Sequence, residues 1–292
     1  MRDFPLPVRV AGPGSQPEDE EPLQYLDMPR EMNMFEMPQV PDDADAVALA
    51  VARDVLAGYL KELAQWDPVA GGDGPRIELA PMPADALTVL NQVLGEGEVS
   101  IRISGPSQYR IQESVFTGIW RVVGLDGDGR TATDGLEAAA LPRVAIAAAR
   151  AAASERLPDV ALPPGAMNSP ALLAEIASQL EARKPGDRAH VINLTLFPMA
   201  PEDHQVLEAA LPVGPVAIMS RGFGNCRVTS TGARDVWRVQ YFNNMNTLIL
   251  DTIEIVDLPE VTAAAAEDLE DSRVRMAELI EWMSESVAEA TP

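Results

Sequence analysis

Several residue types are scarce in this sequence of 292 residues, and each shortage narrows the chemistry that the chain can perform. The single cysteine, Cys226, excludes an intramolecular disulfide framework and a multi-cysteine metal centre. The only histidines, His190 and His204, stand in no ligand-spaced cluster, so we expect no metal site. The only lysines, Lys61 and Lys184, do not follow a glycine, which excludes the ordinary phosphate-binding P-loop. We therefore expect neither a metal nor a cofactor.

Aromatic residues and positive charge are also in short supply. Aromatic residues make up 5% of a chain that is 47% hydrophobic, so alanine and aliphatic side chains must fill the core. The 45 acidic residues against 22 basic ones give a formal net charge of -23 at pH 7. This charge repels phosphate backbones, so we expect no nucleic-acid partner, and it favours basic partner surfaces.

Long apolar runs are absent from the sequence. The amino-terminal stretch "MRDFPLPVRV" lacks the apolar centre of a secretory signal. The alanine-rich run "VAIAAARAAAS" is interrupted by Arg150 and is too short to span a bilayer. We therefore expect no membrane span and a cytoplasmic location.

The sequence contains a long internal similarity. Residues Pro81–Val122 align with Pro198–Val239 without a gap, at an offset of 117 residues, and 13 of the 42 positions are identical. A repeat of this length predicts an internal duplication. Residues that both copies share, such as Trp120 and Trp237, are more simply explained by folding than by function.

The hydrophobic spacing within each copy predicts helices and strands in the same order. Helical spacing marks "DADAVALAVARDVLAGYLKELAQW" and "SPALLAEIASQLEARK", in which Ser169 is the expected cap. The stretches "RIELAP", "INLTLFP", "EVSIRIS", "PVAIMS", "IWRVVG" and "VWRVQYF" are typical of strands. We predict an α+β fold of two tandem units related by a pseudo-two-fold, each with a small, mainly antiparallel sheet and packed helices.

The same pattern predicts four segments along the chain. The first, residues 1–45, is an extended, acidic arm rich in proline and methionine, which is either disordered or docked on its own domain or a partner. The others are a first repeat (46–156), a Pro-rich linker (157–168) and a second repeat (169–292).

The two copies differ most where "SGPSQYRIQES" aligns with "RGFGNCRVTST". Cys226 stands there in place of Tyr109, so the thiol belongs to one copy only. Two interpretations stay open: a small buried side chain on a strand, or an accessible thiol whose pKa Arg221 and Arg227 lower. We expect this divergent segment to lie in the functional neighbourhood.

The stretches "TLFPMAPEDHQVLEAAL", "SRGFGNCRVTSTGARDVWRVQYFNNMNTLILDTIEIVDLPEV" and "FPLPVRVAGPGSQPEDEEPLQYLDMPREMNMFEMP" resemble the HupH/HyaF hydrogenase expression/formation proteins. The resemblance implies an accessory protein or assembly chaperone for maturation of an uptake-type nickel–iron hydrogenase. Such a protein is not an enzyme, and it binds a hydrogenase subunit precursor or another maturation protein. The family motif falls on Ser220–Asp251, which gives these candidates for partner binding: Arg221, Phe223, Asn225, Cys226, Arg227, Tyr241, Asn243 and Asn244.

Two other classes of function remain open from the residues. One is a thiol-dependent redox or transfer enzyme that uses Cys226, for which only His190 and His204 are available as a base. The other is a small-ligand binding module at the cleft between the two repeats.

Overall fold

The structure, a computed structural model, describes residues 45–69, 72–222 and 224–290. The helices are α1 (Ala46–Leu63), α2 (Ala84–Leu94), α3 (Arg143–Ala152), α4 (Ser169–Ala182), α5 (Pro201–Ala210) and α6 (Ala266–Ala290), with 3-10 turns η1 (Leu194–Leu196) and η2 (Glu260–Thr262). The strands are β1 (Arg76–Glu78), β2 (Val99–Ile103), β3 (Gln108–Glu113), β4 (Ile119–Leu125), β5 (Thr131–Ala138), β6 (His190–Asn193), β7 (Val213–Ser220), β8 (Asn225–Thr231), β9 (Val236–Phe242) and β10 (Leu248–Ile255). The predicted arm lies outside the described residues, apart from Asp45.

The strands form one ten-stranded sheet in the order β1-β5-β4-β3-β2-β7-β8-β9-β10-β6, and the paired strands run antiparallel. The predicted α+β class and antiparallel pairing are confirmed. The expected division into one small sheet per repeat is not found, because β2 pairs with β7 along Val99–Ile103 and makes the sheet continuous. The pairing satisfies backbone groups that two edge strands would otherwise leave open.

The middle of the sheet is covered on one face by α3. Ala145 and Ala149 of this helix pack against apolar side chains from both halves of the sheet. These include Ile101, Ile111, Trp120 and Val122 from the first half, and Val216, Ile218, Val228, Trp237 and Val239 from the second. Both tryptophans are buried, as predicted for scaffold residues.

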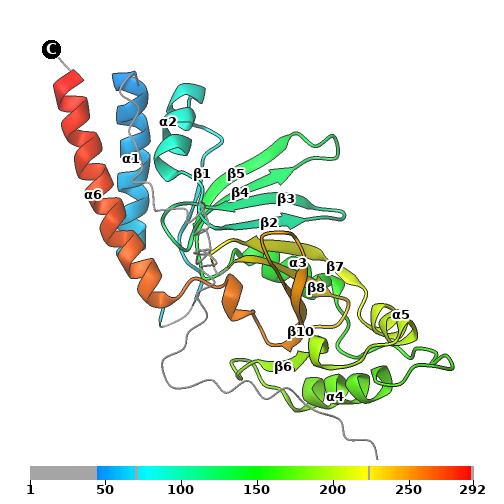
Figure 1. Cartoon of the computed structure of the whole chain (residues 1–292). Helices are drawn as coiled ribbons and strands as arrows, with labels where there is room; N and C mark the ends of the chain where they lie inside the picture. Colours follow the sequence, from blue (N-terminus) through cyan, green and yellow to red (C-terminus); the bar gives the residue numbers. More distant parts are fainter. Residues whose placement is uncertain (1–44, 70–71, 223, 291–292) are drawn as a thin grey trace, which may run out of the picture. The chain divides into compact units, whose positions relative to one another are not determined.

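Among the described elements, helices cover the other face of the sheet toward its two ends and leave its centre open. At the β1 end, α1 and α2 enclose a core with Leu136 of β5, and α6 adds Met276 and Met283 to it. Helix α6 runs beside α1 (Figure 1), although its sequence position assigns it to the second predicted repeat. At the β6 end, α4 and α5 pack on β10 residues such as Ile253. None of the helices described here is long and apolar enough to cross a membrane.

Local hydrogen bonds set where several elements begin. The Asp45 carboxylate accepts a 3.0 Å bond from the Ala48 amide and caps α1. Ser169 does not cap α4 as predicted, because its amide and hydroxyl both donate to Asp203 of α5 at 2.8 Å. The Ser169 amide is the main cause of a pKa of Asp203 far below its usual range, outweighing burial.

The stretch "INLTLFP", predicted as a strand, is a strand only as far as Asn193. The Asn193 side chain accepts a 3.0 Å hydrogen bond from the Thr195 amide. This turn starts the 3-10 segment η1. A local Asx-type turn at Asn193 therefore ends the strand, although the apolar sequence that follows is compatible with a strand.

Candidate partner-binding site

The segment that carries the family motif forms the end of β7, all of β8 and β9, the turn into β10 and the first half of β10. Arg221 follows β7 and is exposed, and its amide donates a 3.2 Å hydrogen bond to the Glu98 carbonyl. Asn225, at the start of β8, is exposed and lies opposite Phe242 of β9. Phe223, another candidate, lies outside the described residues.

Cys226 is buried on the face of the sheet that α3 covers, with 2% of the residue exposed. Burial raises the pKa of its thiol to about 11, a hydrogen bond with Tyr241 opposes this rise, and the Glu254 charge adds to it. The hypothesis of a thiolate stabilised by arginine is therefore wrong for this structure. Adjacent strand residues point to opposite faces, so Arg227 is directed away from the sulfur.

Tyr241 lies beside Cys226 across the β8–β9 pair. Burial raises the pKa of its hydroxyl to about 12, and the charges of Cys226 and Glu254 act in the same direction. The Glu254 carboxyl also has a raised pKa, caused mainly by its own burial. All three groups are thus held in their protonated forms more firmly than in water, which suits packing better than nucleophilic attack.

Arg227 is exposed on the opposite face of β8. Its guanidinium lies over the ring of Phe242, 5.5 Å from the ring centroid. Met219, directly opposite Arg227 on β7, is 49% exposed. Arginine, aromatic ring and thioether together form an accessible surface with both charge and apolar area.

The turn between β9 and β10 extends the motif beyond the sheet. The Asn243 side-chain oxygen accepts hydrogen bonds from the Met245 and Thr247 amides, both at 2.9 Å. Asn246 adopts a φ of 56°, a conformation that asparagine tolerates. The tip leaves Asn244 exposed, and Met245 is 85% exposed.

The candidate residues therefore divide between two faces and a turn. Cys226 and Tyr241 belong to the packed face, Asn225 and Arg227 to the uncovered face, and Asn243 with Asn244 to the hairpin tip. The structure does not bring them together as one pocket. Among the candidates that the structure describes, those on the uncovered face and at the tip are exposed and therefore open to contact with a large partner.

Sequence reasoning missed two residues that share the uncovered face with Arg227. Arg102 of β2 and Arg110 of β3 are exposed and lie directly opposite one another. Arg110 aligns with Arg227 at the repeat offset, so the comparison of copies assigned it to the scaffold. The alternation in "VSIRI" could have identified Arg102, because it places this residue on the face of the strand opposite to Ile101 and Ile103.

Two shared arginines do serve the scaffold. Arg121 donates two hydrogen bonds of 2.6 Å to Asp134, and Arg238 donates bonds of 3.0 and 2.7 Å to Asp251. Each pair joins neighbouring strands by a two-point contact of high geometric specificity. The aspartates are therefore strand carboxylates engaged in ion pairs.

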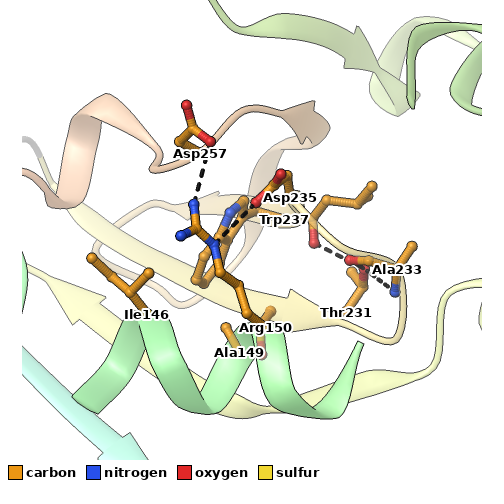
Figure 2. Close-up of a pocket in the computed structure, with 10 residues that line it drawn as sticks. Ile146, Ala149, Arg150, Thr231, Ala233, Asp235, Trp237 and Asp257 are labelled. Carbon is orange, nitrogen blue, oxygen red and sulfur yellow. Dashed lines mark hydrogen bonds and ion pairs between the residues drawn. The ribbon is translucent and has the colours of Figure 1, made fainter. Parts of the chain in front are cut away.

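A small pocket lies where α3 meets the turn between β8 and β9 (Figure 2). Its lining includes Ile146 and Arg150 of α3, Trp237 of β9, and Asp257. The indole nitrogen of Trp237 is buried without a hydrogen-bond partner among the described residues. The space is about the size of a single water molecule, so it does not accommodate an organic ligand.

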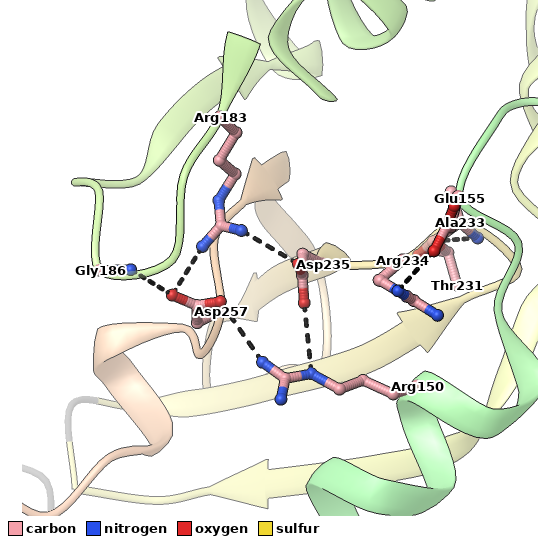
Figure 3. A network of polar contacts seen from close by, with 9 residues as sticks. All are labelled: Arg150, Glu155, Arg183, Gly186, Thr231, Ala233, Arg234, Asp235 and Asp257. Atoms are coloured by element: carbon pink, nitrogen blue, oxygen red, sulfur yellow. Dashed lines mark hydrogen bonds and ion pairs between the residues drawn. The ribbon is translucent and has the colours of Figure 1, made fainter. Parts of the chain in front are cut away.

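An ion network beside this pocket ties four segments together (Figure 3). Arg183 contacts Asp235 at 3.0 Å and Asp257 at 2.8 Å, while Arg150 reaches the same two carboxylates at 3.6 and 3.4 Å. Burial opposes ionisation of Asp257, but bonds from the Gly186 amide and from Arg183 outweigh it and lower its pKa. Charges paired in this way hold α3, α4 and the two loops in place.

The described residues contain no group of three or more histidine, cysteine, aspartate or glutamate side chains that could hold a metal ion. What they present is an α+β protein with a ten-stranded antiparallel sheet, one uncovered basic area and an exposed hairpin tip.

Comparison with known proteins places this chain in a family. The sequence model described as HupH hydrogenase expression protein, C-terminal conserved region, matches residues 49–161 and 166–283. Hydrogenase expression/formation protein HoxQ of Cupriavidus necator is 47% identical over 284 residues, which cover 97% of this chain and 99% of that protein. The chain therefore belongs to the HupH hydrogenase expression protein family.

Two other relatives also match nearly the whole chain, at lower identity. Hydrogenase expression/formation protein HupH of Rhodobacter capsulatus is 40% identical over 96% of this chain and 98% of its own length. Hydrogenase-1 operon protein HyaF of Escherichia coli is 33% identical over 95% of this chain and 96% of its own length. A solved structure of hydrogenase expression protein HupH from Thiobacillus denitrificans has 27% identity, covers 40% of this chain and 96% of that one, and gives a TM-score of 0.36.

Proposed function

We propose that this protein is an accessory protein or assembly chaperone in the maturation of an uptake-type nickel–iron hydrogenase. It would bind a hydrogenase subunit precursor or another maturation protein in the cytoplasm. The observation that carries the proposal is similarity at 33–47% identity, over 95–97% of the chain, to proteins named for hydrogenase expression or formation or for a hydrogenase operon.

The chemistry of the divergent segment supports binding in preference to catalysis. The Cys226 thiol is buried and its raised pKa of about 11 disfavours the thiolate that a nucleophile needs. The exposed residues around it, Asn225 and Arg227, are suited to contacts with a protein surface. The competing proposal of a thiol-dependent enzyme would need Cys226 to become accessible.

A second proposal concerns the origin of the scaffold in a duplication with a pseudo-two-fold. The family model matches the chain twice, and the matches start 117 residues apart, at 49 and 166. Strands β4 and β9, and strands β5 and β10, begin and end at positions with this same offset. In the central pairing Ile101 lies opposite Ile218, its own counterpart, as residues do across a two-fold axis.

The duplication proposal makes a geometric prediction. Residues 76–142 and 193–259 should superpose with Trp120 on Trp237 and Arg110 on Arg227. Superposition at a different offset would contradict it. The division into repeats at 46–156 and 169–292 remains a proposal as well, with α6 completing the core of the opposite half.

The proposed role in maturation is tested in a strain that lacks this protein. We expect loss of hydrogenase activity with unprocessed hydrogenase subunits still present, and restoration by the full chain carrying an affinity tag. A pull-down from the restored strain should recover a hydrogenase subunit precursor or maturation protein, identified by mass. Normal hydrogenase activity in the deletion strain would contradict the role. Restored activity with no hydrogenase-related protein in the pull-down would contradict the binding mechanism.

A further inference from the structure

Arginine is concentrated at the centre of the sheet on the face opposite α3, which no described helix covers. We call it the arginine face and define it by two rows of side chains across β4, β3, β2, β7, β8 and β9. One row reads Val123, Arg110, Arg102, Ala217, Thr229 and Arg238. The neighbouring row reads Arg121, Gln112, Ser100, Met219, Arg227 and Gln240.

The charge on this face has the opposite sign to that of the protein. The two rows hold five arginines and no carboxylate, within a chain whose formal net charge is -23. At the outer ends of the two rows, Asp134 forms an ion pair with Arg121 and Asp251 forms one with Arg238. The hydrogen bond to Asp251 raises the pKa of Arg238, and the negative charge of Glu208 also raises it. Glu98 lies at the border of the arginine face, where its backbone carbonyl accepts a hydrogen bond from the Arg221 amide.

Three guanidinium groups of the arginine face remain without a carboxylate partner among the described residues. These are Arg102, Arg110 and Arg227, all exposed. Arg102 and Arg110 are direct cross-strand neighbours. Like charges in that position repel and destabilise a sheet, so the pair works against local stability. An anion bound between the two side chains would attract both guanidinium groups and so replace this repulsion with a net stabilising contact.

The surroundings of these arginines indicate what kind of anion fits. A guanidinium presents a planar fork that matches a carboxylate. Ser100 and Thr229 add neutral hydrogen-bonding groups, while exposed Met219 and the Arg227–Phe242 stack add apolar area. From β3 to β8 there are three strand spacings, about 14 Å, which an extended peptide of about four to five residues spans. Side chains alternating between acidic and apolar would satisfy both components of the face.

We propose that the arginine face binds a carboxylate-rich segment of a partner protein, with Arg102, Arg110 and Arg227 pairing with its carboxylates. The inference rests on the proposed function only in taking the occupant to be another protein. A nucleic acid fits less well, because the chain's overall charge repels a polyphosphate and because Arg227 already covers the Phe242 ring.

The test measures binding of a short fluorescent peptide of alternating glutamate and alanine to the full chain by fluorescence anisotropy. A peptide of alternating glutamine and alanine is the neutral probe, and a single-stranded DNA of similar length is the polyphosphate probe. The assay needs no hydrogenase component, so its failure is distinguishable from failure of the proposed role in maturation.

The decisive variant is Arg102→Gln/Arg110→Gln, and its matched control is Arg130→Gln/Arg234→Gln, which removes two exposed arginines elsewhere. We expect the first variant to weaken binding of the acidic peptide at least about tenfold, and the control to change it by less than about twofold. The first variant should also be as stable as the wild type or more so, because it removes a like-charge pair.

Each other outcome overturns the proposal. Equal weakening in the two variants would show that binding follows overall charge and not the arginine face. Tighter binding of the DNA, or equal binding of the neutral peptide, would assign a different ligand class. A full chain with Glu18→Gln, Asp19→Asn, Glu20→Gln and Glu21→Gln tests the chain's own acidic run as occupant. Peptide binding about tenfold tighter in this variant than in the wild type would identify that run as a competitor and contradict a partner-specific surface.

Discussion

The two hairpin tips of the sheet have the same turn hydrogen bonds and backbone conformation but present different side chains to solvent. In the β4–β5 tip the Asp126 carboxylate accepts from the amides two and four residues ahead, both at 2.9 Å, as Asn243 does in the β9–β10 tip. The next-to-last position is left-handed in both, as Gly129 with φ 77° and as Asn246 with φ 56°.

Outward-facing side chains separate these otherwise equivalent turns. The first tip is charged, with Arg130 3.4 Å from Asp128. The second is neutral and exposes Met245. Turn geometry needs only one side-chain acceptor and one residue that tolerates positive φ, so the remaining positions are free to define what the tip contacts.

The turn before β4 and the turn before β9 show the same contrast at a single position. Gly118, with φ 80°, and Asp235, with φ 56°, lie 117 residues apart. A Cβ on Gly118 would overlap the Leu269 side chain of α6 and approach Ala264 at 3.1 Å. Asp235 instead extends its carboxylate to Arg150 and Arg183. The same backbone conformation therefore lets α6 pack closely on the turn at Gly118 in one half and places the Asp235 carboxylate in an ion network in the other.

Exchanging these two residues gives the largest expected effect. Gly118→Asp should lower the free energy of unfolding by about 3 kcal/mol, because it combines overpacking against Leu269 with strain at positive φ. Asp235→Gly should cost less, about 1–2 kcal/mol, since glycine accepts the conformation and only the carboxylate is lost. Urea unfolding of both variants measures the difference, and the reverse order of costs would contradict this account of the two turns.

The second prediction concerns a titrating group that only the first half possesses. Burial raises the pKa of Glu113 to about 7, against opposing hydrogen bonds from backbone amides that include Gly118 at 3.0 Å. At the repeat offset the second half has Ser230, which does not titrate. A carboxyl with a raised pKa contributes stability that is fully present below its unfolded value near pH 4.5 and is lost as the pH rises through about 7.

Glu113→Gln should remove this dependence. Relative to the wild type, the variant should gain about 2–3 kcal/mol in unfolding free energy between pH 4.5 and pH 8, as the wild type loses the contribution of the bound proton. Urea titrations over this range measure it, with Ser230→Ala as the control that keeps the wild-type slope. Parallel profiles for wild type and Glu113→Gln would contradict the raised pKa.

Much of the fold was accessible from hydrophobic spacing because periodicity reports burial directly. The strands around Trp120 and Trp237 and helices α1 and α4 were located in this way. Hydrophobic spacing did not predict that the two halves join into one sheet, because nothing in the spacing of β2 shows which strand pairs with its open edge. The packing of α6 on α1 is likewise a choice between apolar surfaces of similar character.

The candidate partner-binding residues stay a prediction, and the structure shows how they are distributed. The sequence named Arg227 and Asn243 together with Cys226, whose side chain faces the opposite side of the sheet. Residue order within a motif does not separate faces unless the strand register is known. The same limit hid Arg102 and Arg110, which join Arg227 only when β2 pairs with β7.

The third prediction exchanges the hairpin tips. The variant carries Asn243→Asp, Asn244→Gly, Met245→Asp, Asn246→Gly and Thr247→Arg, which copies the first tip onto the second. We expect unfolding free energy to change by less than about 0.5 kcal/mol, because the turn hydrogen bonds are kept. Hydrogenase activity in cells should fall about tenfold if the tip contacts the maturation partner, equivalent to about 1.4 kcal/mol of lost interaction.

The reverse exchange, placing the second tip's residues at Asp126–Arg130, is the matched control and should leave hydrogenase activity within about twofold of wild type. Equal protein levels must accompany both results, measured by immunoblot. If the two exchanges reduced activity equally, the second half would have no special role and the contrast between the tips would be incidental.

The variant with the smallest expected effect on hydrogenase activity is Cys226→Ala. Cys226 occupies the position that Tyr109 holds in the first half, and both side chains contribute to the core beneath α3. Removing one sulfur leaves a small cavity, so the free energy of unfolding should fall by about 1 kcal/mol or less. Tyr109→Ala, which removes a whole ring, should cost about 2–3 kcal/mol. Urea unfolding compares the two.

The same thiol tests the enzyme alternative. With a pKa of about 11, roughly one thiol in ten thousand is ionised at pH 7. A mild thiol reagent at neutral pH should therefore modify the native protein far more slowly than the urea-unfolded chain, and a Cys226→Ala strain should keep its hydrogenase activity. Rapid stoichiometric modification of the folded protein, together with loss of activity in that strain, would instead give Cys226 a chemical role. That result would move the functional centre from the exposed residues of β8 to the face that α3 covers, and would require this helix to move aside during the reaction.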